Sequence, residues 1–244
     1  MIPTTELFTG RAKNYARYRP SYPREIIDVL VRECQLCPSS IVADIGSGTG
    51  ILSRLFLDFG SAVFGVEPNQ EMRQAAEKIL KDYPSFKSVA GTAEATTLKN
   101  ASVDFITAGQ AFHWFDASLA WQEFPRILKP KGWVVLLWNG RCKTTPFLKA
   151  YEKFLLTLGK EGTIDTKGVA KFFGGNFSTK KFQHSQTLDC EGLKGYFLSR
   201  SYAPQKNHPS YLPTIKTLQA LFEQHQINNR VTFEHETVMY YSRL

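Results

Sequence analysis

Residues 42–50 read V-A-D-I-G-S-G-T-G and separate a β-branched run from a helical pattern over Ile51–Phe59. A glycine-rich turn between a strand and a helix is a common form of ligand-binding site. Gly46 and Gly48 let the backbone turn sharply and approach a ligand without interference from a Cβ atom. Gly50 opens the helix, whose N-terminus offers free N–H groups. These features predict that a small ligand binds at this turn.

Short apolar runs and amphipathic stretches alternate outward from the turn. Parallel strands need crossover connections, and the intervening helices supply them. Near-continuous apolar strands indicate a sheet that is covered on both faces. The sequence therefore predicts an α/β fold with a doubly wound, mostly parallel sheet. The strand patterns cover 41–45, 62–66, 86–90, 103–108 and 133–138, and the helical patterns cover 23–36, 51–59, 70–81 and 117–128.

The composition is that of an ordinary globular chain, with 43% hydrophobic and 21% charged residues in a length of 244. The formal net charge is +8, but the densest basic run is Lys180-Lys181, so we expect no nucleic-acid partner. The first ten residues lack the pattern of a secretory signal, and the apolar run Trp133–Trp138 is too short to cross a bilayer. We therefore expect a cytoplasmic protein without a membrane partner. Cys34 and Cys37 form a single C-x-x-C without a second ligand pair, so we expect no metal site.

Two acidic residues restrict the chemistry of the expected ligand. The glycine spacing is G-x-G-x-G, because Ile51 stands where a dinucleotide site would have its third glycine. Asp44, two residues before the first glycine, would repel a pyrophosphate and suits an ammonium group. Glu67 ends the next strand, where an acid can accept hydrogen bonds from both ribose hydroxyls. Adenosine joined to an amino acid ammonium, without phosphate, describes S-adenosylmethionine.

Several motifs together resemble class I S-adenosylmethionine-dependent methyltransferases. This resemblance covers most of the chain, and it implies a Rossmann-like methyltransferase fold with a seven-stranded sheet, a helical lid insertion and S-adenosyl-L-methionine as cofactor. The cofactor motifs are D-I-G-S-G-T-G at 44–50, V-E-P-N-Q-E-M at 66–72 and G-T-A-E-A-T-T-L at 91–98. Three more motifs resemble the small-molecule subgroup related to trans-aconitate methyltransferase: Y-A-R-Y-R-P-S-Y-P at 15–23, G-Q-A-F-H-W-F-D at 109–116 and S-R-S-Y-A-P at 199–204.

We expect a single methyltransferase domain over residues 1–244. After residue 139 the patterns predict helices at 146–158, 191–199 and 211–225, and a strand at 231–241. The expected parts are an N-terminal cap segment at 1–37, a cofactor-binding half at 38–140, a lid at 141–178 and the C-terminal half of the sheet at 179–244.

The resemblance also implies roles for individual residues. Tyr18 and Arg19 would fold over the cofactor, and Arg19 would pair with its carboxylate. Gln110 would lie under the methionine moiety. The glycine turn and its acids would hold the methionine part and the ribose: Asp44, Gly46, Gly48, Gly50 and Glu67. The residues beside the adenine would be Pro68, Met72, Thr92, Ala93 and Glu94.

A second group of residues is expected near the methyl acceptor. His113 is the candidate general base, since imidazole titrates near neutral pH, although aromatic packing alone could hold it in place. The candidate substrate contacts are Tyr15, Trp114, Arg200 and Tyr202. Arg200 could instead form a surface ion pair, and Tyr202 could belong to the core.

These features predict methyl transfer from S-adenosylmethionine to a small acceptor, with a carboxylate favoured because of the positive charge surplus and of Arg19 and Arg200. One alternative is a methyltransferase that acts on nucleic acid or protein, which predicts a contiguous basic face beside the cofactor. The other is a non-catalytic regulatory protein that binds the cofactor without turnover. Oxygen, nitrogen and carbon are all compatible with the sequence as the methylated atom, as are a monomer and a homodimer.

Overall fold

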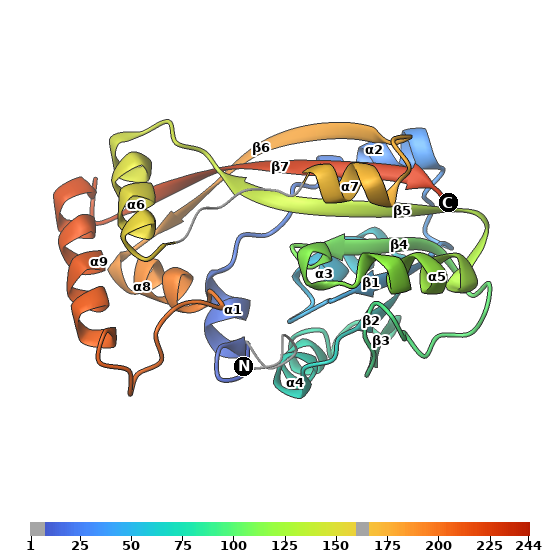
Figure 1. Ribbon diagram of the computed structural model, residues 1–244, viewed down its shortest axis with the longest axis horizontal. Helices are drawn as coiled ribbons and strands as arrows, with labels where there is room; N and C mark the ends of the chain where they lie inside the picture. The colour runs from blue at the N-terminus through green and yellow to red at the C-terminus, as the bar shows by residue number, and fades with distance from the viewer. Residues whose placement is uncertain (1–7, 160–165) are drawn as a thin grey trace.

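A single mixed β-sheet forms the centre of the molecule (Figure 1). The computed structural model describes residues 8–159 and 166–244, and the strands within these ranges pair in the order β3-β2-β1-β4-β5-β7-β6. The strands are β1 (Ile41–Ile45), β2 (Ala62–Val66), β3 (Phe86–Val89), β4 (Val103–Gly109), β5 (Leu128–Arg141), β6 (Ser178–Leu188) and β7 (Val231–Arg243). The helices are α1 (Ala12–Tyr18), α2 (Glu25–Cys34), α3 (Ile51–Phe59), α4 (Gln70–Ile79), α5 (Ala117–Ile127), α6 (Pro146–Thr157), α7 (Thr166–Phe172), α8 (Cys190–Leu198) and α9 (Tyr211–His225), with a 3₁₀ turn, η2, at Phe112–Trp114.

The strands from β3 to β5 are parallel. β1 pairs in parallel with β2 and β4, β2 with β3, and β4 with β5. β7 runs antiparallel to both β5 and β6. This arrangement confirms the predicted mostly parallel α/β sheet, and it brings the carboxyl ends of the parallel strands to one edge, where open α/β sheets bind their ligands.

Helices cover both faces of the sheet, as predicted from the near-continuous apolar strands. Successive residues of β5 show this directly, because their side chains alternate between two cores. Val134 and Leu136 belong to one core with the apolar faces of α5 and α7. Val135 and Leu137 belong to the other core with α2 and α3. All four residues are fully buried, so the sheet is sandwiched between helices.

The helices α6, α8 and α9 form a third core beyond the sheet, at the left of Figure 1, where β6 and β7 extend past the parallel strands. Tyr151, Tyr196, Leu218 and Phe233 are fully buried within it. We call this part the helical cluster. In Figure 1, α1 stands between the helical cluster and the parallel strands, so this N-terminal helix faces the carboxyl edge of the sheet.

The segment 141–178, expected as a lid, divides between two places. α6 belongs to the helical cluster. α7 packs on the sheet beside α5, where the Phe172 ring lies 5.0 Å from that of Phe112 and 5.8 Å from that of Phe124, centroid to centroid. Residues 160–165 of this segment lie outside the described ranges. The described residues of the segment therefore bury their apolar faces in two different cores rather than in one lid.

Candidate functional site

The glycine turn lies at the carboxyl edge of the parallel strands and borders a pocket, which we call the outer pocket. Its volume is about 830 Å³, including space that is open to solvent. The pocket is formed by the ends of β1, β2 and β4, by α4 and by the N-terminal segment. The lining residues are Phe8, Tyr15, Gly46, Gly48, Glu67, Pro68, Met72, Thr92, Ala93, Glu94, Gly109, Gln110, Ala111, Trp114 and Phe115. Residues from all three cofactor motifs thus meet in one pocket.

The backbone of the turn has the conformation that favours glycine. Gly46, Gly48 and Gly50 have φ angles of +67°, +56° and +82°. A Cβ atom at Gly46 would lie only 2.6 Å from the Cβ of Ala111, so the close approach of the β4 end also requires glycine there. Gly50 does not line the pocket; it is the N-cap of α3, and a Cβ there would meet the side chain of Leu80. Gly46 and Gly48 therefore border the ligand space, and Gly50 shapes the turn.

Glu67 connects the end of β2 to the glycine turn. Its carboxylate accepts hydrogen bonds from the backbone N–H groups of Gly48 and Asn69, both at 2.9 Å. The side chain lines the outer pocket but the residue is only 8% exposed, and burial raises its pKa above the usual range despite these two hydrogen bonds. A carboxylate held in this way at a strand end can accept hydrogen bonds from ribose hydroxyls.

The residues expected beside the adenine form an apolar part of the outer pocket. Met72 and Ala93 are 2% and 3% exposed and lie beside Pro68. Glu94 also lines the pocket, and its carboxylate accepts a hydrogen bond of 2.8 Å from the backbone N–H of Asp116, which is the N-cap of α5. Glu94 therefore fixes its loop to the start of α5, and the apolar lining suits a flat heterocycle.

A second space, the inner pocket, shares Tyr15, Gly46, Gly109 and Gln110 with the outer one. Its volume is about 480 Å³, again with open space included. It lies between the glycine turn and the helical cluster. The residues that it adds are Arg19, Pro20, Tyr22, Asp44, Ser47, Ile51, Leu52, Asn139, Tyr196 and Arg200. A ligand that fills both spaces would pass over Gly46 and Gln110.

Asp44 is the acidic residue of the inner pocket. The residue is 1% exposed, and its carboxylate accepts hydrogen bonds from the Ser53 hydroxyl at 2.6 Å and the Thr107 hydroxyl at 3.3 Å. Burial raises the pKa of Asp44 to about 7, against the opposing effect of these hydroxyls. A cationic ligand group would favour the ionised carboxylate, so this site suits an ammonium ion.

Two arginines lie in the inner pocket. Arg19 donates a hydrogen bond of 3.3 Å to the backbone oxygen of Ser199, and its guanidinium carbon lies 4.7 Å from the ring centroid of Tyr15. Arg200 lies at the same 4.7 Å from the ring of Tyr196 and donates to its hydroxyl. The Nε atoms of both arginines are buried without a hydrogen-bond partner among the residues that the structure describes. Burial and repulsion from Arg200 lower the pKa of Arg19 to about 10.

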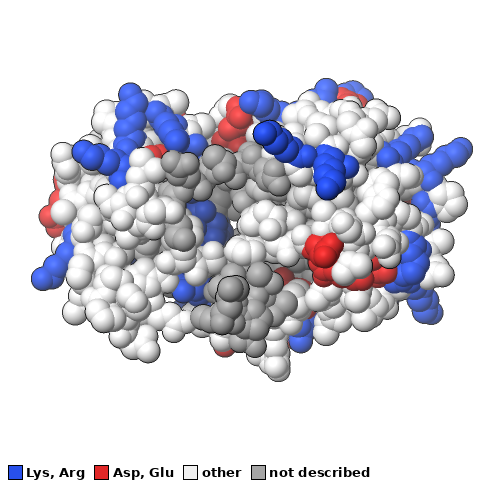
Figure 2. Space-filling model, in the orientation of Figure 1, with Lys and Arg blue, Asp and Glu red and all other residues white. Residues whose placement is uncertain are grey.

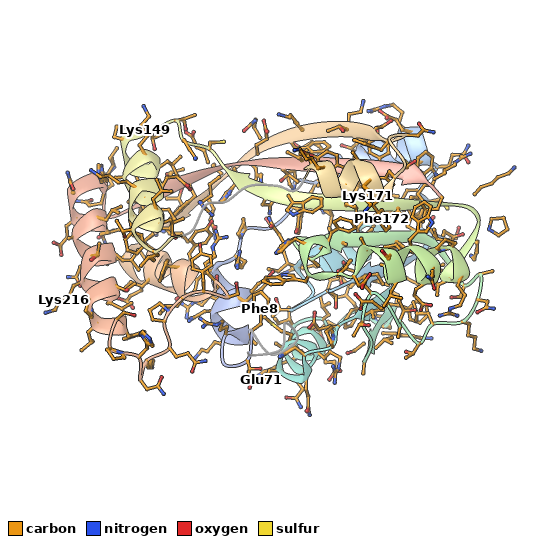
Figure 3. All side chains as sticks on the ribbon, viewed as in Figure 1. Phe8, Glu71, Lys149, Lys171, Phe172 and Lys216 are labelled. Carbon is orange, nitrogen blue, oxygen red and sulfur yellow. The ribbon has the colours of Figure 1, made fainter. Side chains whose placement is uncertain are left out.

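The N-terminal segment contributes to both pockets through Tyr15. Phe8, labelled in Figure 3, packs edge-on against Tyr15 and Trp114, with ring centroids 5.8 and 6.3 Å apart. Tyr18 was expected over the cofactor, but it is not among the lining residues of either pocket. Its ring packs against α8, where the missing side chain of Gly195 leaves room for it.

The residues expected near the acceptor are only partly brought together. Trp114 lines the outer pocket and Arg200 the inner one. His113 lines neither pocket and is exposed, with its ring 4.7 Å from that of Trp114; partial desolvation and then the Arg19 charge lower its pKa. Tyr202 packs beside Phe197 in the helical cluster, with ring centroids 6.3 Å apart. The described geometry thus provides no contact between His113 and the ligand space.

Eight residues of the inner pocket were not predicted as site residues: Pro20, Tyr22, Ser47, Ile51, Leu52, Gly109, Asn139 and Tyr196. Tyr22 lies within the motif at 15–23, and Asn139 directly follows the predicted strand Trp133–Trp138. Tyr196 is fully buried. Its position one helical turn before Arg200 is the signal that could have identified it.

Within residues 8–159 and 166–244, no three or more His, Cys, Asp or Glu side chains gather in a way that could hold a metal ion. The same ranges contain no helix with the length and apolar character needed to cross a bilayer.

Comparison with known sequences places the site in a family. A family model described as a methyltransferase domain matches residues 43–136, from the glycine turn into β5. An uncharacterised methyltransferase-like protein of Schizosaccharomyces pombe is 31% identical over 201 residues, which cover 80% of this chain and 77% of that protein. An uncharacterised methyltransferase of Mycobacterium tuberculosis is 39% identical over 127 residues, which cover 52% of this chain and 49% of that protein. The chain thus spans about half the length of this second relative.

Solved structures share the fold at low sequence identity. One described as a type II methyltransferase from Anaeromyxobacter dehalogenans has a TM-score of 0.67 and 20% identity, and the match covers 93% of this chain and 98% of that one. One described as a methyltransferase from an antibiotic biosynthesis pathway of Anabaena variabilis has a TM-score of 0.62 and 20% identity, with 88% and 96% covered. At such identities the likeness shows the fold alone.

Proposed function

This chain belongs to the class I S-adenosylmethionine-dependent methyltransferases, and we propose from this premise that it methylates the carboxylate of a small molecule. The residues present fit S-adenosylmethionine. A Cβ atom at Gly48 would lie 3.8 Å from the ring of Tyr15, which also lines the outer pocket, so the glycine leaves the backbone of the turn open to a ligand there. Asp44 offers a buried acid for the ammonium group, and Glu67 offers a carboxylate for the ribose.

The proposal of a carboxylate acceptor rests on the pair of arginines in the inner pocket. Neither Arg19 nor Arg200 forms an ion pair within residues 8–159 and 166–244. Both side chains are partly buried, and leaving a partly buried charge without a counter-ion is unfavourable, a cost that a ligand carboxylate would remove. The cofactor brings one carboxylate for two arginines, so an anionic acceptor would supply the second.

In the proposed reaction, the main task of the chain is to position two reactants. When bound, the cofactor supplies a methyl group on a positively charged sulfur, which is already activated for in-line displacement. The chain orients the acceptor beside the shared wall of the two pockets, and Phe8 and Trp114 add an aromatic wall to the outer pocket. A carboxylate acceptor is ionised at neutral pH and needs no general base. This agrees with the position of His113 outside both pockets.

On the face drawn in Figure 2, the distribution of charge favours a small acceptor over nucleic acid. The alternative requires a continuous basic face beside the cofactor. Figure 2 shows one face of the molecule, on which Lys and Arg side chains occur in separate groups with acidic side chains near several of them. The motif resemblance to the trans-aconitate-related subgroup supports the same conclusion, since its members act on small molecules.

The proposal is tested with S-adenosylmethionine that carries a labelled methyl group. The wild-type protein is incubated with a panel of small carboxylic acids and with the matched amides. Label should appear in at least one acid as an ester that releases methanol in base, and the matched amide should stay unlabelled. Equal labelling of acid and amide would contradict the carboxylate assignment. Binding of the cofactor without any turnover, or label in added nucleic acid or protein, would favour the alternatives.

A further inference from the structure

Tyr196 and Arg200 form a structural unit at the C-terminal end of α8. The Arg200 guanidinium lies over the Tyr196 ring and donates a hydrogen bond to the Tyr196 hydroxyl. The Tyr196 ring itself is fully buried, and its centroid lies 4.5 Å from that of Phe233 on β7. Because the ring is held by the helical cluster, the hydroxyl fixes one edge of the guanidinium in place. The orientation of Arg200 in the inner pocket is therefore set by Tyr196.

The Arg200 guanidinium has a nitrogen without a hydrogen-bond acceptor in the described part of the chain. Its Nε atom is buried and lacks a partner within the described ranges. The neighbouring Arg141 is different, because its Nε donates to Glu152 at 2.6 Å in a mostly buried ion pair. Arg141 is thus neutralised by the chain itself, whereas Arg200 is not. A guanidinium that is fixed on one edge and free on another can take a carboxylate with defined geometry.

The two unpaired arginines differ in what they contact. Arg19 lies against Tyr15, which lines both pockets, so Arg19 stands near their junction, where the methionine part of the cofactor is expected. Arg200 lies against Tyr196, which lines only the inner pocket. Both arginines line the inner pocket and repel each other, and this difference in contacts puts Arg19 on the cofactor side and Arg200 on the side of the helical cluster.

We propose that Arg200 binds the carboxylate of the methyl acceptor and determines specificity, and that Tyr196 is the positioning residue that sets the Arg200 guanidinium. This inference rests on the proposed function and names the side chains that carry it. From its burial alone, Tyr196 would be counted as a core residue. The inference gives it a role in acceptor binding. It also assigns recognition of the cofactor carboxylate to Arg19 and of the acceptor to Arg200.

Binding to the product-loaded protein tests the assignment without turnover. The protein is saturated with S-adenosylhomocysteine and titrated by calorimetry with acetate, succinate and citrate as probes. At least one acid should bind the wild type, and Arg200→Gln should weaken that binding by about 10- to 100-fold, as expected for lost charged hydrogen bonds. Affinity for S-adenosylhomocysteine should not change in this variant. The matched control is Arg17→Gln, since Arg17 is exposed and lines neither pocket.

Tyr196→Phe separates positioning from packing, because it keeps the buried ring and removes only the hydroxyl. With the best acid as acceptor, this variant should raise KM for the acid several-fold. Its kcat and its KM for S-adenosylmethionine should stay near the wild-type values. Equal changes in all three constants, or a lowered melting temperature with an unchanged KM, would show that the hydroxyl is only structural.

The outcomes separate this inference from the proposed function. If the wild type binds and methylates an acid and Arg200→Gln does so equally well, Arg200 is not the acceptor residue, although the carboxylate function stands. Loss of S-adenosylhomocysteine binding in Arg200→Gln would assign Arg200 to the cofactor instead. If the wild type binds none of the three acids, both the inference and its premise are wrong.

Discussion

Asp44 shows how burial can prepare a side chain for a charged ligand. In the ligand-free protein its pKa is raised to about 7 by burial, so the folded state binds a proton that the unfolded chain would have released near pH 4. This difference in bound protons sets the direction in which folding stability changes with pH. The contribution of Asp44 to folding becomes less favourable as pH rises from about 4 through about 7, and then stays constant. An ammonium group beside Asp44 would favour the ionised form and offset this loss.

The first prediction is that the affinity for S-adenosylmethionine depends on the ionisation of Asp44. Affinity should rise with pH, by about tenfold per unit well below pH 7, and level off above it, because only the ionised carboxylate attracts the ammonium group. Calorimetry between pH 5.5 and 8.5 measures this dependence. Asp44→Asn should bind weakly with a flat profile. A wild-type profile that is flat across pH 7 would argue against contact between Asp44 and the ammonium group.

The second prediction concerns Glu67. Glu67→Ala removes the carboxylate expected at the ribose and the acceptor of the Gly48 and Asn69 N–H groups. The affinity for S-adenosylmethionine should fall by about 1–3 kcal/mol in calorimetry. Glu77→Ala is the control, because Glu77 is exposed on α4 and lines neither pocket. An affinity equal to that of the wild type would remove the ribose assignment.

The glycine turn allows a matched comparison between backbone strain and steric overlap. Gly46 and Gly174 have similar φ angles of +67° and +61°. A Cβ atom at Gly46 would overlap the Cβ of Ala111, whereas a Cβ atom at Gly174 would have nothing within 4 Å. Gly174→Ala should therefore cost about 1–2 kcal/mol of unfolding free energy, from the left-handed backbone alone. Gly46→Ala should cost more in urea unfolding and should also weaken cofactor binding. Equal costs would mean that the turn relaxes without difficulty.

The sequence predicted the elements that have local signals. The turn at 42–50, the helix at 211–225 and the alternation of strands and helices follow from residues close in the chain. β5 was predicted only at 133–138, but it spans Leu128–Arg141 because pairing with β4 and β7 extends it beyond its apolar centre. Such extension depends on partners that are distant in sequence, so no local pattern reports it.

The acceptor side of the site was harder to predict for the same reason. The inner pocket joins Tyr22 from the N-terminal segment, Asn139 from β5 and Tyr196 from α8, which meet only after folding. His113 was proposed from its residue type and its position after β4. The short turn η2 places it outside both pockets, and only the three-dimensional path of the chain shows this.

In the molecule as a whole, the N-terminal segment bridges the parallel sheet side and the helical cluster. The Gly10 N–H donates to Glu71 on α4 at 2.5 Å. The Arg11 guanidinium donates to the backbone oxygens of Leu198 and Ala203 at 3.1 and 2.7 Å, beside the end of α8. Phe8 and Tyr15, on either side of these contacts, line the outer pocket. A cofactor enclosed there would have to leave past this segment.

The last prediction concerns this enclosure. Saturation with S-adenosylhomocysteine should slow amide hydrogen exchange over residues 8–22 together with the turn at 46–50, because both would then contact the ligand and open less often. Exchange in α9, which lines neither pocket, should change little and serves as the internal control. Arg11→Gln removes charged donors that hold the segment to Leu198 and Ala203, so it should lower the unfolding free energy by about 1–3 kcal/mol and reduce the protection of residues 8–22. Protection of the turn alone, with residues 8–22 unchanged in the wild type, would mean that the segment stands beside the cofactor without enclosing it.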